Sequence, residues 1–325
     1  MTDQNENQAT PEQPATAKAE PTARSMRTVA MTALGGTSIE WYDFFIYGTA
    51  AALVFPTLFF AEDMPRYVSL IASFSTFAVG FLARPVGGVV FGHFGDRVGR
   101  KAALVTALMM MGVATTLIGL LPGYADIGPL APLLLIFLRF VQGLAVGGQW
   151  GGAMLLVTEN APSNQRGFYG AFAQVGAPAG LVLANLAFLA VSGSLSDEAF
   201  MDWGWRVPFI SSVLLIGLSL YVQLKLEDTE AFKELAEASE PAAAKPRSPV
   251  VQALKTYPRE IGLAAGSFLG VQVTFYICVA WIISYGNDPE GLNIARSDML
   301  TAVLISTMFA IPANFIFGAW SDRHG

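Results

Sequence analysis

The sequence predicts an all-α integral membrane protein, and three observations support this fold class. Hydrophobic residues make up 53% of the chain and charged residues only 14%, whereas a soluble domain spreads more charge over its surface. Apolar stretches of about 20 residues or more recur, the length that a helix needs to cross a bilayer core of roughly 30 Å. Alternating strand patterns are absent, so the sequence does not support a barrel.

The chain begins with a polar segment, residues 1–25, which is rich in Gln, Thr, Ala, Pro and Glu. This composition cannot bury a core, so we expect a disordered tail. Eight candidate spans follow, with ends defined only to within several residues. They lie at about 29–60, 67–94, 102–122, 131–158, 168–192, 205–224, 260–286 and 298–319. The organisation is therefore an N-terminal part at 26–225, a polar central loop at 226–258 and a C-terminal part at 259–325.

The distribution of Lys and Arg between the two ends of the spans predicts the orientation in the membrane. A cytoplasmic N-terminus places most of them in the cytoplasm: Lys18, Arg24, Arg27, Arg97, Arg100, Lys101, Arg166, Lys225, Lys233, Lys245, Arg247, Lys255, Arg259 and Arg323. Only Arg66, Arg206 and Arg296 then lie on the opposite side. This bias predicts a multi-pass protein of the cell membrane whose N-terminus and central loop are cytoplasmic.

Two loops, one after the second span and one at the end of the chain, share a sequence signature. The first copy contains Gly92, Asp96, Arg97, Gly99, Arg100 and Lys101, and the second contains Gly318, Asp322, Arg323 and Gly325. Their Gly, Asp and Arg positions are separated by a constant offset, which indicates two six-helix halves in tandem. The glycines allow a tight turn, the Asp can accept hydrogen bonds from a helix N-terminus, and the Arg can pair across a closing interface. The alternative is an ordinary basic loop.

This Gly-x-x-x-Asp-Arg-x-Gly-Arg-Lys signature resembles the hallmark of the major facilitator superfamily. The resemblance implies a helical bundle with a complete six-helix N-terminal half and the first two helices of the second half. It also implies a gating role for Gly92, Asp96, Arg97, Gly99, Arg100, Lys101, Asp322 and Arg323. Since the superfamily normally has twelve spans, we expect the chain that ends at Gly325 to be truncated.

Three further motifs resemble the metabolite:proton symporter family within that superfamily. They are Gly36-Thr-Ser-Ile-Glu40-Trp-Tyr-Asp43-Phe-Phe-Ile-Tyr47-Gly48 in the first span, Leu82-Ala-Arg84-Pro85-Val-Gly87-Gly88 in the second, and Gly147-Gly148-Gln149-Trp150-Gly151-Gly152-Ala153 in the fourth. The resemblance implies proton-driven uptake of a small organic acid or zwitterion by alternating access. There are two alternatives: an exporter of the superfamily, and a sensor that keeps the carrier fold without transport.

Ionisable residues inside the spans are candidates for function, because each costs roughly 2.5 kcal/mol or more in the bilayer. Glu40 and Asp43 are three residues apart on one helix face that Tyr47 continues. We expect this face to line a central cavity. Burial and a nearby arginine act in opposite directions on the proton affinity of a carboxylate, so such an acid can exchange a proton as access alternates. Asp43 and Glu40 are therefore candidates for proton coupling, and a static ion pair is the alternative.

Arg139 in the fourth span begins Arg-Phe-Val-Gln142-Gly, which resembles a superfamily motif associated with proton coupling and substrate binding. Arg139, Gln142, Val146 and Gln149 share one helix face, where a fixed cation beside amides could bind a carboxylate. Structural pairing of Arg139 with an acid of the first span is the alternative. Gln149 departs from the family, which more often carries Glu there, and an amide cannot carry a proton.

Other polar residues in the spans are candidates for lining the cavity: Tyr47, Gln174, Asn185, Gln272, Tyr276 and Asn314. Interhelical hydrogen bonds explain them equally well. Arg84 is predicted either to belong to a gate or to extend toward the membrane surface. Glycines four residues apart, including Gly143, Gly147, Gly176 and Gly180, predict close helix packing.

Several functions are not supported by the sequence. His93 and His324 have no metal-ligand spacing, no nucleophile and base are paired, and no phosphate-binding loop is present. We therefore expect neither an enzyme nor a cofactor. The net charge is −6 and basic residues are not interleaved with aromatics, which disfavours nucleic acid. The expected partners are a small substrate, protons and the lipid bilayer, with the chain monomeric, and the single Cys278 allows no intrachain disulfide.

Overall fold

The computed structural model describes residues 23–98, 100–147, 157, 161–162, 164–227, 256–289 and 291–324. Within them the N-terminal part has six long helices: α1 (Ala23–Leu53), α3 (Arg66–Val98), α4 (Arg100–Leu120), α6 (Leu130–Gly147), α8 (Arg166–Ser194) and α10 (Arg206–Glu227). Short elements join them: α2 (Phe55–Leu58), α5 (Tyr124–Ile127), α9 (Asp197–Ala199) and the π-helical turn η1 (Phe200–Gly204). The C-terminal part has α13 (Pro258–Tyr276), the π-helical turn η2 (Ile277–Trp281), α14 (Ile282–Gly286) and α15 (Arg296–His324).

These helices confirm the all-α membrane fold. Each predicted span corresponds to one long helical segment, in which α13, η2 and α14 count as one, although the fourth span beyond Gly147 lies mostly outside the described residues. Five described segments are long and apolar enough to cross a bilayer: 66–94, 130–147, 166–194, 258–286 and 296–324. The first predicted span began and ended too late, because the helix runs from Ala23 to Leu53 and the short helix α2, with Pro56 in its first turn, follows it.

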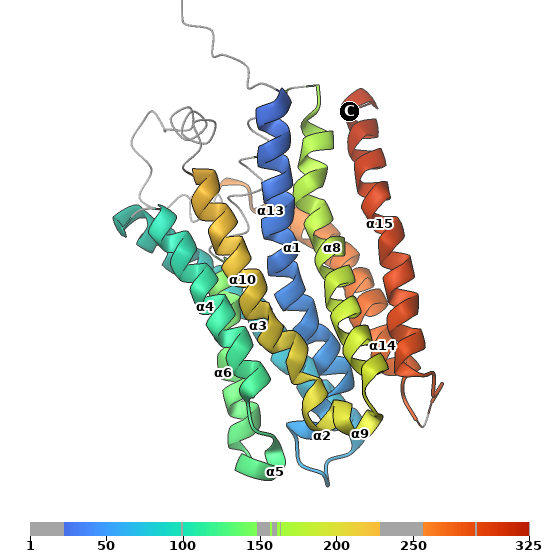
Figure 1. The fold of residues 1–325 in the computed structure, drawn as a ribbon. Coiled ribbons are helices and arrows are strands. Elements are labelled where there is room, and N and C mark those ends of the chain that lie inside the picture. The colour runs from blue at the N-terminus through green and yellow to red at the C-terminus, as the bar shows by residue number, and fades with distance from the viewer. Residues whose placement is uncertain are drawn as a thin grey trace, which may run out of the picture.

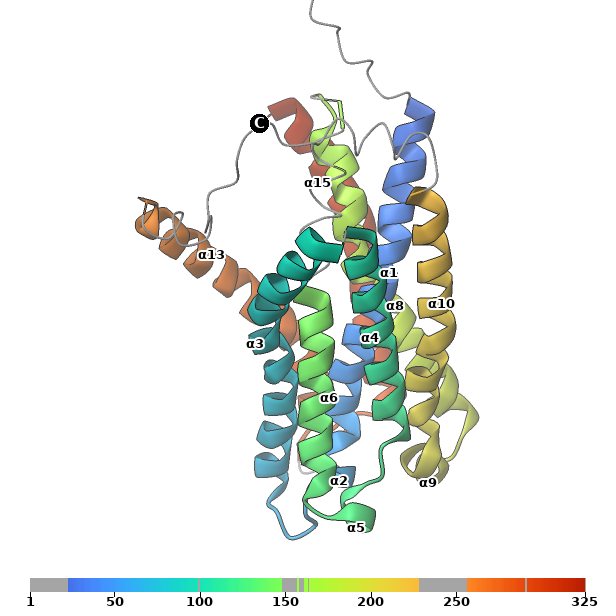
Figure 2. The same cartoon turned by 90° about the vertical axis from the view of Figure 1, so that its left-hand side faces the viewer.

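The long helices lie side by side around α1 (Figure 1), and α8 packs along both α1 and α15. Helix α3 packs along α6, and α4 lies between α6 and α10. Near α2 and α9 the bundle encloses its largest buried side chains, which include Phe55, Phe59, Trp205 and Phe209. Figure 2 shows α13 leaving the bundle at an angle, and most of its side chains are exposed.

Glycines allow two helix pairs to approach closely, as their spacing predicted. Added Cβ atoms on Gly143 and Gly147 of α6 would collide with backbone atoms of α3. Gly176 and Gly180 of α8 have the same relation to α1, where Thr37 and Trp41 leave no room for a side chain. The rest of the predicted glycine run, 148–152, lies outside the described residues. Close packing of this kind is how helices associate in lipid, where no hydrophobic force drives them together.

The two signature segments are helical and not loops, which corrects the sequence-based expectation. Helix α3 continues through Gly92, Asp96 and Arg97 to Val98, and α15 continues through Asp322 and Arg323 to His324. Arg100 and Lys101 begin α4, so any turn is confined to the neighbourhood of Gly99, which lies outside the described residues. The side chains of Asp96, Arg97, Arg100 and Lys101 also lie outside the described part of the structure.

Candidate functional site

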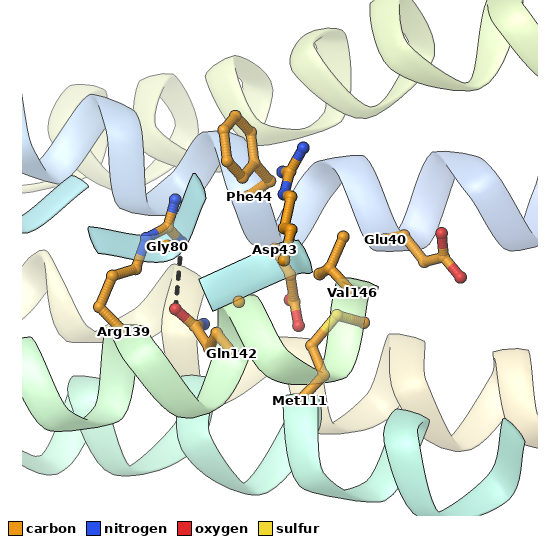
Figure 3. A pocket seen from close by; sticks show the side chains of 10 residues that line it. Glu40, Asp43, Phe44, Gly80, Met111, Arg139, Gln142 and Val146 are labelled. Carbon is orange, nitrogen blue, oxygen red and sulfur yellow. Dashed lines mark hydrogen bonds between the residues drawn. The ribbon is translucent and has the colours of Figure 1, made fainter. Parts of the chain in front are cut away.

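A small cavity lies between α1, α3, α4 and α6 in the middle of the bundle (Figure 3). It is lined by Glu40, Asp43, Phe44, Gly80, Arg84, Met111, Arg139, Gln142, Gly143 and Val146. Its volume is about 10 Å³, which is room for about one water molecule. The site therefore has no room for a larger molecule unless the helices move.

Helix α1 contributes the acidic side of this cavity. Asp43 and Glu40 both line it, as their three-residue spacing predicted, and they follow one another along the helix in Figure 3. Asp43 is only 1% exposed. Its Oδ2 accepts a hydrogen bond from the Thr115 hydroxyl at 3.0 Å, while its Oδ1 has no hydrogen-bond partner. A buried polar atom without a partner costs free energy, so this oxygen marks a site for a proton, a water or a ligand group.

Helix α6 contributes the basic side, where Arg139 is 2% exposed. Its guanidinium carbon lies 4.1 Å from the ring centroid of Tyr47, 4.7 Å from that of Phe77 and 4.9 Å from that of Phe44. Cation–π attraction is strongest where water is excluded, so these rings stabilise the buried charge. The Nε and Nη2 groups have no hydrogen-bond partner. Arg139 therefore presents unused donors in a fixed orientation.

A chain of hydrogen bonds connects the basic side to the acidic side. Arg139 Nη1 donates to Gln142 Oε1 at 3.1 Å, and Gln142 Nε2 donates to Thr115 Oγ1 at 2.6 Å. The Thr115 hydroxyl in turn donates to Asp43 Oδ2. Arg139 and Asp43 are thus linked through two uncharged side chains. The alternative predicted for Arg139 was an ion pair with an acid of the first span. In the described residues the link from Arg139 to Asp43 is this indirect chain and not a direct ion pair.

Arg84, which lines the cavity, and Tyr276 both lie beside the rings of Phe44 and Phe81. The Arg84 guanidinium carbon lies 4.8 Å from the Phe44 centroid and 4.7 Å from the Phe81 centroid. The Tyr276 ring, from α13, lies 5.3 Å from the Phe81 ring and 6.0 Å from the Phe44 ring. The Tyr276 hydroxyl is buried without a hydrogen-bond partner. A residue of the C-terminal part therefore packs against rings beside a site that the N-terminal part builds.

The remaining predicted site residues are divided between this cavity and other places. Tyr47 supports Arg139 with its ring, and its hydroxyl shares a 2.7 Å hydrogen bond with Thr76. Gln174 is not at the cavity but lines a groove of about 500 Å³ between α8 and α15, together with Asn314. Gln272 is half-buried on α13 and does not line the central cavity. Gln149 lies outside the described residues.

Sequence reasoning missed four residues that build the site. Thr115 carries the link to Asp43, Phe44 and Phe77 flank Arg139, and Gly80 leaves space for its guanidinium. A hydroxyl in α4, the apolar third long helix, was a visible signal for Thr115. The rings gave none, because an apolar side chain facing a cavity and one facing lipid look alike in sequence.

The end of the bundle where α1 begins is closed by a contact between α15 and α8. Asp322 accepts hydrogen bonds from the backbone N–H groups of Gly167 at 2.6 Å and Phe168 at 2.8 Å, in the first turn of α8. A carboxylate there satisfies unpaired donors and complements the helix dipole. Gly167 and Gly318 pack backbone against backbone beside it. The gating role of the signature stays a prediction.

Among the described residues, the opposite end carries two ion pairs between the N-terminal and C-terminal parts. Arg296 at the start of α15 pairs with Asp197 of α9 at 3.1 Å, and its guanidinium carbon lies 4.2 Å from the Phe200 ring centroid. Arg66 at the start of α3 pairs with Asp288 at 3.4 Å. The N-terminal and C-terminal parts are therefore in contact at both ends of the bundle.

We expect Asp322→Asn to loosen the contact between α8 and α15. The amide cannot match two N–H donors or the helix dipole, so the contact weakens by about 1–2 kcal/mol, roughly 5- to 30-fold in its equilibrium. We use a parent protein in which Cys278 is replaced and Gln174→Cys adds a single cysteine. Maleimide labelling of this cysteine should be several-fold faster in the Asp322→Asn variant than in the parent. Asp298→Asn, in the first turn of α15 at the far end, is the control. Equal labelling rates in the parent, Asp322→Asn and Asp298→Asn proteins would contradict the predicted role of Asp322.

An apolar helical bundle that encloses opposed charges in a small central cavity is typical of membrane carriers. The family profile "Sugar (and other) transporter" matches residues 28–282. The chain belongs to this family of the major facilitator superfamily, which confirms the resemblance predicted from the signature.

Several curated transport proteins of bacteria are similar to most of this chain. The chain is 46% identical over 286 residues to the inner membrane metabolite transport protein YhjE of Escherichia coli, covering 87% of this chain and 64% of that protein. It is 44% identical over 266 residues to the shikimate transporter of E. coli, covering 82% and 60%. A proline/betaine transporter of Salmonella typhimurium is 33% identical over 310 residues, covering 92% and 60%. The chain therefore spans less than two thirds of these relatives.

Solved structures show the same fold. A partially occluded, inward-open form of the xylose transporter XylE from E. coli superimposes with a TM-score of 0.61 at 16% identity, covering 89% of this chain and 69% of that one. A crystal structure of a D-xylose-proton symporter gives 0.62 at 16% identity, covering 88% and 66%. At this identity the likeness defines the fold alone.

Proposed function

We propose that this protein is a proton-coupled symporter that takes up a small organic acid or zwitterion by alternating access. The observation that carries the proposal is the pair of unsatisfied charged groups in the small cavity: the free donors of Arg139 and the free oxygen of Asp43. Buried charges without full pairing are costly, so a site keeps them for a ligand and a proton.

Arg139 would bind the carboxylate of the substrate. A guanidinium offers parallel N–H donors that match a carboxylate, and the three rings around it hold that fork in place. Shikimate, proline and betaine, named for the relatives, each contain a carboxylate. The buried hydroxyl of Tyr276 would add a hydrogen bond from the other half when the cavity closes.

Asp43 would carry the proton. A neutral Asp43 lowers the free-energy cost of closing the site around the bound substrate. When the site then opens to the other side of the membrane, Asp43 can release the proton. The orientation expected from the basic residues puts the α8–α15 contact through Asp322 on the cytoplasmic side. The ion pairs of Arg66 and Arg296 would then lie outside.

The test is uptake of labelled organic acids and zwitterions by cells that express the full-length protein, with and without a protonophore. Accumulation that the protonophore abolishes supports the proposal. Accumulation that ignores it indicates facilitated diffusion, and outward movement indicates an exporter. Binding without flux indicates a sensor.

Gly80→Ala should weaken substrate binding without any change to a polar group. A Cβ at Gly80 would lie 2.6 Å from Arg139 Nε, so the guanidinium must leave its place between the rings. Overpacking of this kind costs about 1–3 kcal/mol, and we expect KM for uptake to rise at least about tenfold. Gly217→Ala on α10, where an added Cβ meets nothing within 4 Å, should leave KM unchanged. An unchanged KM in Gly80→Ala would contradict the placement of Arg139 at the binding site.

A further inference from the structure

The hydroxyl of Thr115 occupies the junction between the two charged sides of the cavity. Thr115 is fully buried on α4. Its oxygen accepts from Gln142 Nε2 at 2.6 Å, and two acceptors compete for its single hydrogen: Asp43 Oδ2 at 3.0 Å and the Met111 carbonyl at 2.9 Å. A hydroxyl has one hydrogen and two lone pairs, so it can serve only one of these acceptors fully.

We propose that Thr115 is the positioning residue that couples the proton on Asp43 to the substrate site at Arg139, an inference that rests on the proposed symport. When Asp43 is ionised, Thr115 donates to its Oδ2. When Asp43 gains a proton on that oxygen, its O–H donates to Thr115, and the Thr115 hydrogen turns to the Met111 carbonyl. The proton comes from a hydronium ion, whose O–H bond breaks and leaves water as the O–H of Asp43 forms; no other covalent bond changes.

The two arrangements differ at Gln142, and this difference reaches Arg139. The Thr115 oxygen accepts one hydrogen bond beside an ionised Asp43 and two beside a neutral Asp43. The electron density on the Thr115 oxygen therefore changes with the protonation of Asp43, and Gln142 Nε2 donates to this oxygen. At the same time, Gln142 Oε1 accepts a hydrogen bond from Arg139 Nη1. Hydrogen bonds in such a chain polarise one another. The protonation of Asp43 thereby changes how firmly Gln142 holds the guanidinium, and with it the donors left for the substrate.

The charged and titratable groups that face Asp43 are few. They are Glu40, Tyr42 and Tyr47 of its own helix, Arg84 of α3 and Arg139 of α6, while the described residues of α4 and α10 contribute the uncharged Thr115 and Ser212. No ion pair between Asp43 and Arg139 is present among the described residues. The hydroxyl chain is therefore the hydrogen-bonded route from the acid to the arginine.

Thr115→Val removes the hydroxyl at equal size, and Thr115→Ser keeps it. In proteoliposomes with the full-length protein, we expect Thr115→Val to lose proton-driven accumulation by a larger factor than it loses substrate exchange. Accumulation driven by a proton gradient should fall at least about tenfold, and KM for exchange should lose its pH dependence. Thr115→Ser should restore both. Thr116→Val is the matched control, because the Thr116 hydroxyl donates only to the backbone of Gly112.

An infrared measurement separates this inference from the proposed function, because it needs no substrate. The carboxyl band of Asp43, assigned with Asp43→Asn, should shift in Thr115→Val and not in Thr116→Val. If the wild type shows no proton-driven accumulation, the proposed function fails and this band still decides whether Thr115 contacts the proton. Normal coupling in Thr115→Val, or an unshifted band, would overturn the inference. Thr115→Ala replaces Thr115→Val in both measurements if the valine variant does not fold.

Discussion

Asp43→Asn abolishes proton-driven accumulation and leaves substrate exchange intact, if Asp43 carries the proton. Asparagine has the same shape and can still accept from Thr115, but it binds no proton. For a zwitterion carried with one proton, a membrane potential of about 100 mV supplies about 2.3 kcal/mol, enough for roughly 50-fold accumulation. In the variant this ratio should fall to about 1. Accumulation ratios and counterflow in the same proteoliposomes give the measurement.

Glu40→Gln is the control for this prediction, because Glu40 lines the same cavity from the same helix. We expect it to keep at least part of the accumulation, since Glu40 is half-buried whereas Asp43 is 1% exposed and hydrogen-bonded to Thr115. Full accumulation by Asp43→Asn together with its loss in Glu40→Gln would transfer the proton-coupling role to Glu40. A loss of folded protein in Asp43→Asn would favour the static structural role instead.

Arg139→Lys raises KM for uptake by about 100-fold, the second large effect that we expect. Lysine keeps the charge but loses the planar fork, so it cannot offer parallel donors to a carboxylate from between three rings. Lysine can still donate one hydrogen bond, and loss of the second, worth about 1.5–3 kcal/mol, accounts for an effect of this size. Initial rates over a range of substrate concentrations measure it.

Arg206→Lys is the matched control for Arg139→Lys. Arg206 also lies over an aromatic ring, 4.5 Å from the Trp205 centroid, but it donates to the backbone carbonyls of Gly119 and Leu121 outside the cavity. Its replacement should leave KM unchanged. If both substitutions raised KM equally, the effect would come from general destabilisation, and Arg139 would lose its assigned role.

The sequence predicted the parts of the site that a bilayer makes costly. Carboxylates and an arginine inside apolar helices must face one another or a cavity, and helical spacing correctly put Glu40 with Asp43 and Arg139 with Gln142 and Val146 on the cavity side. The eight spans followed from hydropathy in the same way. Both predictions rest on large free energies, which is why they were accessible without a structure.

The missed features depend on contacts between helices that are far apart in sequence. Gln174 looked like a cavity residue, but its helix turns it into the groove beside α15. Thr115 became important only because α4 packs against both α1 and α6, and Gly80 only because α3 approaches α6 at Arg139. The signature segments looked like loops because of their glycines and charges, yet α3 and α15 tolerate both near their ends.

The most direct test of proton-coupled uptake is the pH of a weakly buffered medium around cells that express the full-length protein. Addition of a transported substrate should make the medium more alkaline as protons enter with it, and a protonophore or Asp43→Asn should remove this signal. Uptake without any pH change, or with acidification of the medium, would contradict the account.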